Sequence, residues 1–222
     1  MRKTIYLFLI VLPFSSCTSL TKFNHFVNEK YSNSSLTSYD YKTDFVNVNT
    51  NGIIKQDSLC RTERIKGAFI PAIFYWYWNN TVKCIVDPKY YADKMAYYLK
   101  TDAEATDMKE KLKGGAINIS IKSLPHSFMY ENKGHLLFAV FAYAMIFKEG
   151  IRPVPENLIL EYEIIKNDSV IQKGTVEILD NNQYMKKTFS SRKKLTWQFI
   201  DTYESNLKAQ SKEAIVKILN EI

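Results

Sequence analysis

This chain of 222 residues contains few cysteines, histidines and glycines, and no hydrophobic run long enough to cross a membrane as a helix. Its longest apolar runs cover about ten to twelve residues, whereas a membrane-spanning helix needs roughly 17–25. There is no Cys-x-x-Cys and the three histidines are scattered, so we expect no metal ion. Nucleophile-elbow, phosphate-loop, His-Glu-x-x-His and dinucleotide-binding motifs are missing too. The sequence therefore predicts no cofactor and offers no motif of a catalytic centre.

The amino terminus carries an export signal. A basic start (residues 1–3), an apolar core (5–14) and two serines come before Cys17. This order is typical of a secretory signal, and the cysteine after the small pair resembles the lipobox of bacterial lipoproteins. We expect cleavage after residue 16, acylation of Cys17 and stable attachment through several acyl chains. The alternative is an ordinary signal with an incidental cysteine.

The charge balance is mildly basic, with 30 Lys and Arg against 23 Asp and Glu and a formal net charge of +7. Because an exported protein does not meet nucleic acid, we expect anionic lipid headgroups or an acidic envelope protein as partners. The residues after Cys17 lack an aspartate at the second position, and in the lipoproteins that this sequence resembles such an aspartate often marks inner-membrane retention. We therefore expect the outer membrane, with the protein facing the periplasm.

Two cysteines remain once Cys17 is acylated. The oxidising periplasm favours a disulfide between Cys60 and Cys84. Such a bond would close a loop of about 25 residues and contribute roughly 3 kcal/mol in the chain-entropy model. The alternative is a pair of buried free thiols.

An aromatic hairpin is predicted early in the chain. Aromatic and β-branched residues fill 68–78 and 81–86, and Asn79-Asn80 between them is typical of a two-residue turn. Pro71 lacks a backbone donor, which places the start of the first strand at a sheet edge or a bulge.

A helix is expected next. Asp87 and Pro88 are typical of an N-cap and a first helical residue, and Gly114-Gly115 of a helix end. Thr101 and Glu104 either restart the helix as a capping box or lie within it.

Strands are expected after that helix. Ile117, Ile119 and Ile121 alternate with polar residues, a pattern that predicts a half-buried strand. The apolar run 136–147 fits a buried strand or a buried helix, and its phenylalanines and β-branched residues favour the strand.

The carboxyl-terminal third predicts a hairpin and a long helix. Hydrophobic strands flank the turn Asn167-Asp168-Ser169, and an amphipathic helix begins at about residue 192. The overall order predicts an α+β domain: a mainly antiparallel sheet with two helices packed on one face, βαβββα-like. We expect this single domain at 65–222, after a polar, partly ordered tether at 17–64.

Candidate catalytic side chains are sparse. His126 and His135 follow Pro125 and Gly134 respectively, and without a nearby nucleophile both are interpreted as surface or turn residues. Glu161 and Glu163 share one strand face and are interpreted as its solvated side.

The aromatic cluster is the strongest candidate for partner binding. Alternation sends Phe74, Trp76 and Trp78 one way and Tyr75 and Tyr77 the other. If helices cover one sheet face only, part of this apolar area faces water, as partner or lipid contacts do. The alternative is that both faces belong to the core, or that the tether covers the second face.

A basic run lies around the start of the last helix. Because cations oppose the helix dipole there, a phosphate-bearing partner is one interpretation and a solvated face is the other. The candidate residues for this anionic contact are Lys186, Lys187, Arg192, Lys193 and Lys194.

The lipobox, the element order and the hairpin that carries Glu161-Tyr162-Glu163 and Gly174 resemble the transport auxiliary lipoproteins of bacterial envelopes. That group includes the lipopolysaccharide-assembly lipoprotein and the auxiliary lipoproteins of ABC-type lipid transporters. The resemblance implies a non-enzymatic binding or assembly accessory in envelope biogenesis or transport, held to the membrane and working with an envelope protein. The alternatives are a hydrolase of envelope glycan or lipid and a purely structural tether.

Overall fold

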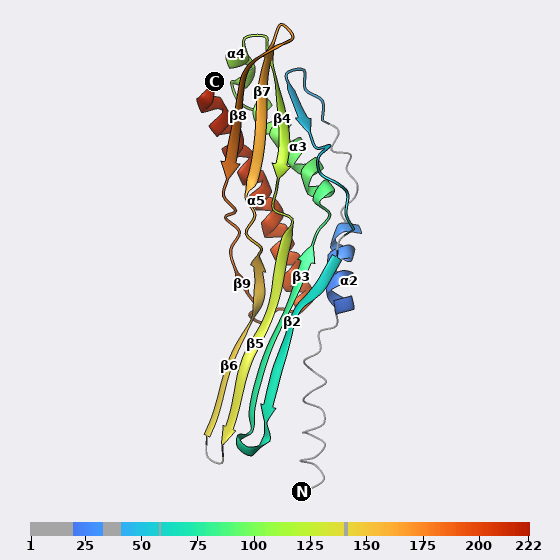
Figure 1. Cartoon of the computed structure of the whole chain (residues 1–222), viewed down its shortest axis with the longest axis vertical. Helices are drawn as coiled ribbons and strands as arrows, with labels where there is room; N and C mark the ends of the chain where they lie inside the picture. The colour runs from blue at the N-terminus through green and yellow to red at the C-terminus, as the bar shows by residue number, and fades with distance from the viewer. Residues whose placement is uncertain (1–19, 33–40, 58, 140–141) are drawn as a thin grey trace.

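The computed structural model describes residues 20–32, 41–57, 59–139 and 142–222. Within these ranges the chain forms four α-helices and two mostly antiparallel sheets, so the expected α+β class is confirmed. The expectation of one sheet with two helices is wrong, because the strands divide between two sheets that follow one another along an elongated molecule (Figure 1). The signal and Cys17 lie outside the described residues.

The first sheet has four strands in the order β1-β4-β7-β8. They are β1 (Val46–Asn49), β4 (Ala116–Ser123), β7 (Leu158–Lys166) and β8 (Ser169–Ile178). The predicted alternation on β4 is confirmed, since Ile117, Ile119 and Ile121 are all buried. Figure 1 shows α3 and α5 together behind this sheet, as expected for helices that cover one face.

Three helices accompany the first sheet: α3 (Pro88–Glu104), α4 (Met108–Leu112) and α5 (Arg192–Glu221). Asp87 caps α3, because its carboxylate accepts the backbone N–H of Lys89 at 3.0 Å. Thr101 lies within α3 and donates to the carbonyls of residues 97 and 98, so it does not restart a helix. The predicted apolar face of α5 is confirmed by its buried residues, among them Leu195, Phe199, Tyr203, Leu207, Ile215 and Leu219.

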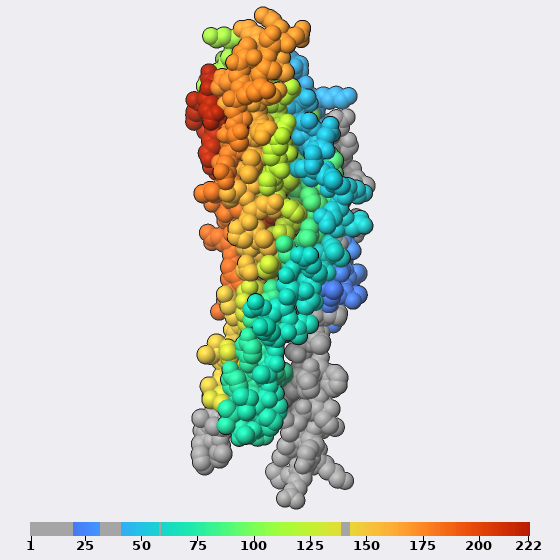
Figure 2. Space-filling view, viewed as in Figure 1, coloured from blue at the N-terminus to red at the C-terminus, as the bar shows by residue number. Residues whose placement is uncertain are grey.

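The second sheet has five strands in the order β2-β3-β5-β6-β9. They are β2 (Leu59–Ile70), β3 (Tyr75–Ile85), β5 (Ser127–Ala139), β6 (Ala142–Pro153) and β9 (Met185–Lys186). β9 pairs with β6 only at Gly150 and Ile151, so β2, β3, β5 and β6 continue without it as a four-stranded extension. This extension forms the narrow end of the molecule (Figures 1 and 2).

The predicted turn at Asn79-Asn80 is wrong. Both asparagines lie inside the continuous strand β3, where they pair with Lys66 and Ile65 on β2. The chain reverses instead at the short 3-10 helix η2 (Pro71–Ile73) and at Phe74, which adopts a left-handed conformation with φ 43°. Asparagine is therefore tolerated in this strand because neighbours on both sides satisfy its backbone groups.

The strand interpretation of the apolar run 136–147 is confirmed, but its single strand becomes two. β5 ends at Ala139, β6 begins at Ala142, and the two pair antiparallel along their whole length. The second predicted hairpin agrees with the structure: Asn167 and Asp168 both have positive φ, at 51° and 59°, between β7 and β8.

The expected polar tether is wrong for its first described part. Residues Leu20–Ser32 form helix α2, in which Phe23 and Val27 are buried. The side-chain oxygen of Asn24 accepts the backbone N–H of Cys60 at 2.6 Å, and the Phe23 ring lies 4.5 Å from that of Tyr130. Phe23 and Val27 are four residues apart, so they lie on the same face of the helix. Through this apolar face α2 packs against the second sheet.

Candidate functional site

The four-stranded extension ends in a segment that contains no charged residue. No Asp, Glu, Lys or Arg occurs in 67–78 or in 134–147, and we call the described part of these two stretches the apolar ribbon. The strands are held in register across it, because Gly67 pairs with Trp78, Trp78 with Gly134 and Gly134 with Phe147. The ribbon projects beyond the helices at the narrow end of the molecule (Figure 1).

The predicted alternation of the aromatic residues is found within β3. Trp76 and Trp78 share one side, which we call the tryptophan face, and their rings lie 5.5 Å apart. Tyr75 and Tyr77 share the other side, the tyrosine face, where both rings contact His135. Phe74 lies in the turn before β3, and its ring contacts those of Phe69 and Phe138 on the same side as the two tryptophans, as expected.

Large apolar side chains are exposed on both faces of the ribbon. On the tyrosine face Ile146 is 71% exposed. Those exposed on the tryptophan face are Phe69, Phe138, Tyr143, Met145 and Phe147, and those on the tyrosine face are Ile70, Leu137 and Ile146. The turn adds Ile73 and Phe74. The alternative that both faces belong to the core is therefore wrong for the ribbon, and no helix among the described residues covers either face. The alternative that the tether covers the second face falls partly on residues outside the described ranges.

Trp78 is fixed by its neighbours on β5. Its indole Nε1 donates to the side-chain oxygen of Asn132 at 2.8 Å. Its ring lies flat over Gly134, where an added Cβ would come within 2.2 Å of the Trp78 ring carbon Cζ2. Glycine at this position thus allows the close approach of an aromatic ring to the backbone of the neighbouring strand.

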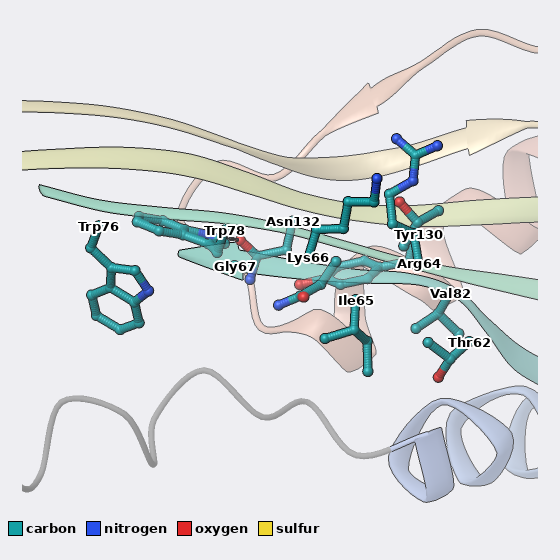
Figure 3. Close-up of a pocket in the computed structure, with 12 residues that line it drawn as sticks. Thr62, Arg64, Ile65, Lys66, Gly67, Trp76, Trp78, Val82, Tyr130 and Asn132 are labelled. Atoms are coloured by element: carbon teal, nitrogen blue, oxygen red, sulfur yellow. Dashed lines mark hydrogen bonds between the residues drawn. The ribbon is translucent and has the colours of Figure 1, made fainter. Parts of the chain in front are cut away.

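A shallow hollow of about 230 Å³ lies beside the two tryptophans. Trp76, Trp78 and Gly67 line its apolar part, and Arg64 and Lys66 come from the edge strand β2. Figure 3 shows Ile65 and Trp76 directed to one side of the sheet while Lys66 and Arg64 rise on the other. The hollow therefore has an aromatic wall, while the cationic groups of Arg64 and Lys66 are directed to the other face of the sheet.

Three lysines form a row where the charge-free ribbon begins. In the strand register Lys66 is opposite Asn79, Asn79 is opposite Lys133, and Lys133 is opposite Lys148. All three lysines therefore lie at one level on the tyrosine face. Lys133 reaches Glu131 at 3.1 Å and the Lys148 ammonium lies over the Tyr184 ring. This lysine row separates the apolar ribbon from the polar part of the sheet.

His126 is the one of the two predicted histidines that lies beside a carboxylate. Its Nδ1 is 2.9 Å from Glu156, whose other oxygen accepts the Ser123 hydroxyl at 3.2 Å. The hydrogen bond to Glu156 outweighs burial and raises the pKa of His126. A catalytic triad needs the imidazole between the hydroxyl and the carboxylate. Here the carboxylate lies in the middle, so the imidazole is not placed to accept the serine proton.

His135 has a different surrounding. Its Nδ1 is hydrogen bonded to the Tyr75 hydroxyl at 2.6 Å, and its ring contacts Tyr77. The imidazole thus adds a polar group to the aromatic cluster of the tyrosine face. Glu161 and Glu163, predicted to be solvated, pair with Lys122 and Lys173 respectively.

The basic run at the start of α5 is largely neutralised within the chain. Lys187 and Arg192 bind the carboxylate of Glu149 at 2.9 and 2.7 Å, and Lys193 binds Glu29 at 2.6 Å. Lys186 and Lys194 are exposed. These carboxylates explain why cations are tolerated at this helix start, and they leave two of the five predicted residues for an anionic partner.

Glu149 is the centre of this ionic cluster and is 3% exposed. Burial raises the pKa of its carboxyl group, but hydrogen bonds from Tyr130, Lys187 and Arg192 outweigh burial, so the pKa is lowered. The cluster lies at the junction between the ribbon and the packed domain, since Glu149 pairs with Asn132 on β5. The cluster therefore connects β5, β6, the residue after β9 and the start of α5 at the base of the ribbon.

The predicted disulfide is confirmed. Cys60 on β2 and Cys84 on β3 are bonded and lie opposite one another in the strand register. Among the described residues, no group of three or more His, Cys, Asp or Glu side chains could hold a metal ion. No helix in the described part of the chain is both long and apolar enough to span a membrane.

No family model, curated protein or solved structure matches this chain. The resemblance to the transport auxiliary lipoproteins therefore stays a prediction.

Sequence reasoning missed the extent of the candidate site. It identified residues 74–78 but neither their partners on β2 and β5 nor the further strand β6 beside β5. One signal was present in the sequence: the two charge-free stretches 67–78 and 134–147 each end at a lysine, Lys66 before the first and Lys133 and Lys148 around the second.

Proposed function

We propose that this protein is a non-enzymatic lipoprotein of the cell envelope, anchored through acylated Cys17 and facing the periplasm from the outer membrane. It uses the apolar ribbon to bind an apolar envelope component in biogenesis or transport. The observation that carries this proposal is a ribbon with large exposed side chains on both faces, attached to an otherwise ordinarily packed domain.

An exposed apolar surface of this kind is unfavourable in water. Exposed apolar patches of several hundred Å² on a soluble protein mark contacts with a partner or a membrane. Here the side chains include Phe69, Phe138 and Ile146, which are more than half exposed. Glu149 and its cationic partners hold the base of the ribbon, and the Cys60–Cys84 bond joins the same two strands β2 and β3 further into the domain, so the ribbon is a braced projection of the domain.

Photo-crosslinking in cells tests this proposal. A benzophenone amino acid replaces Phe69 or Met145 on the ribbon, or Ile171 on β8 as a matched exposed control. We expect the two ribbon positions to form adducts with a lipid or with one defined membrane protein, and the control to form neither. Absence of adducts from both ribbon positions, in protein that is folded and exported, would contradict the proposed function.

A further inference from the structure

We propose that the apolar component bound by the ribbon is a leaflet of the membrane to which Cys17 is anchored: the turn of the ribbon enters the acyl region, and the lysine row lies at the headgroups. This inference rests on the proposed function and names the partner of the same surface. A lipid bilayer fits better than a protein groove because the ribbon exposes apolar side chains on both faces, and a surrounding medium covers both at once.

The charge pattern along the ribbon follows the layers of a membrane. Beyond the level of Lys66 no charged residue occurs as far as the turn, as the acyl region requires. Trp78 and Tyr77 lie one and two positions beyond that level, where aromatic side chains suit the boundary between headgroups and acyl chains. Lys66, Lys133 and Lys148 then fall where anionic headgroups attract cations.

The direction in which the chain enters the domain places the anchor on the same side. Phe23 packs on Tyr130 at the base of the ribbon, while Tyr31, later in α2, is hydrogen bonded to Tyr91 of α3. The first turn of α2 therefore points towards the ribbon, as Figure 1 shows. Cys17 precedes Leu20 by three residues, a reach of at most about 11 Å, so acyl chains attached to it start within that distance of the first turn of α2.

The open edges of the sheet limit how deep the ribbon can go. Within the described residues β2 is an edge strand, and β6 is paired on its outer side only at Gly150 and Ile151. Unpaired backbone groups are costly in hydrocarbon but are hydrated among the headgroups. The four residue-to-residue steps from Lys66 to Ile70 span about 13 Å. With the lysines at the headgroups, the turn thus reaches about 5–10 Å into the acyl region.

Tryptophan quenching by brominated lipids tests this depth, because the chain has three tryptophans and two lie in the ribbon. The acylated protein, purified from membranes, is reconstituted into vesicles of phosphatidylcholine and phosphatidylglycerol with bromines near the headgroup or near mid-chain. Single-tryptophan forms are made by Trp→Phe changes at the other two positions. Trp197 on α5, whose Nε1 donates to the carbonyl of Phe26, is the matched control.

We expect Trp78 to lose most of its emission with bromines near the headgroup. Trp76 should be quenched more by the deeper bromines, and Trp197 by neither. Lys66→Glu should weaken quenching of both ribbon tryptophans in anionic vesicles, whereas Lys212→Glu on the exposed side of α5 should leave it unchanged. Equal quenching of all three tryptophans, or none of Trp76 and Trp78, would overturn the inference.

The two tests separate the inference from the proposed function. If the ribbon tryptophans are not quenched but Phe69 and Met145 positions crosslink to one membrane protein, the function stands and the bilayer is not the partner. If neither quenching nor any adduct is found, both proposals fail.

Discussion

Glu149 shows how single residues brace the ribbon. Removing a buried carboxylate that has cationic partners destabilises the protein, because the charge of those partners is left inside it without compensation. We expect Glu149→Gln to lower the free energy of unfolding by about 3 kcal/mol, measured by urea denaturation at neutral pH. Glu213→Gln is the control, since Glu213 pairs with Lys217 on the exposed side of α5 and should cost less than about 0.5 kcal/mol. Equal losses in the two variants would contradict the role given to Glu149.

The same residue predicts a pH dependence. The pKa of Glu149 is lowered in the folded protein, so its contribution is fully present above the unfolded value of about 4.3. It is lost as the pH falls through the lower, folded value. We therefore expect stability to fall in acid, and the fall to be smaller in Glu149→Gln than in the wild type, in urea titrations repeated between neutral and acidic pH.

Gly134 tests the packing of the tryptophan face. A Cβ at this position would overlap the Trp78 ring, so Gly134→Ala should displace that ring and cost about 1–3 kcal/mol. The measurement is urea unfolding together with the emission spectrum of Trp78. Gly52→Ala is the matched control, because nothing lies within 4 Å of the added methyl group. An unchanged Trp78 spectrum in Gly134→Ala would show that the ring does not lie on this glycine.

At the scale of elements, helix α2 belongs to the folded domain. Phe23 is fully buried and packs on Phe26 and Tyr130, so Phe23→Ala should cost about 3 kcal/mol in urea unfolding. Phe189→Ala provides the comparison, since that ring is fully exposed and its loss should have little effect. If the two changes were equally harmless, α2 would behave as the tether that the sequence predicts.

Elements with strong local signals could be predicted from the sequence. The Asp87 cap, the alternating isoleucines of β4 and the positive-φ turn at Asn167 and Asp168 each follow from one residue type in a defined place. In all these cases the local preference and the tertiary packing agree.

The elements that could not be predicted lack such local signals. β2 shows almost no alternation, because nearly every residue from Arg61 to Ile70 is exposed on either face. The turn at Pro71–Ile73 ends in Phe74, a residue seldom found with positive φ, so no composition rule marks it. The apolar run 136–147 also contains no residue type that marks where one strand ends and the next begins. A ribbon that is apolar on both faces does not have the half-buried pattern from which strands are normally recognised.

For the whole molecule, the two ends have different physical characters. The end with the sheet β1-β4-β7-β8 buries most of its apolar side chains beneath α3 and α5, whereas the ribbon at the other end exposes them on both faces. The two ends are seen in Figure 1. The α+β class and the candidate aromatic residues could be predicted from the sequence. The division into two sheets could not, because it depends on which strands pair over long distances.

Neutron reflectometry of the acylated protein on a supported bilayer locates protein density relative to the lipid layers, so it measures whether the ribbon enters the membrane. We expect protein density that overlaps the outer part of one leaflet's acyl region by about 5–10 Å, with the bulk of the domain beyond the headgroups. Protein density confined to the water side of the headgroups, with the acyl region free of protein, would contradict this expectation.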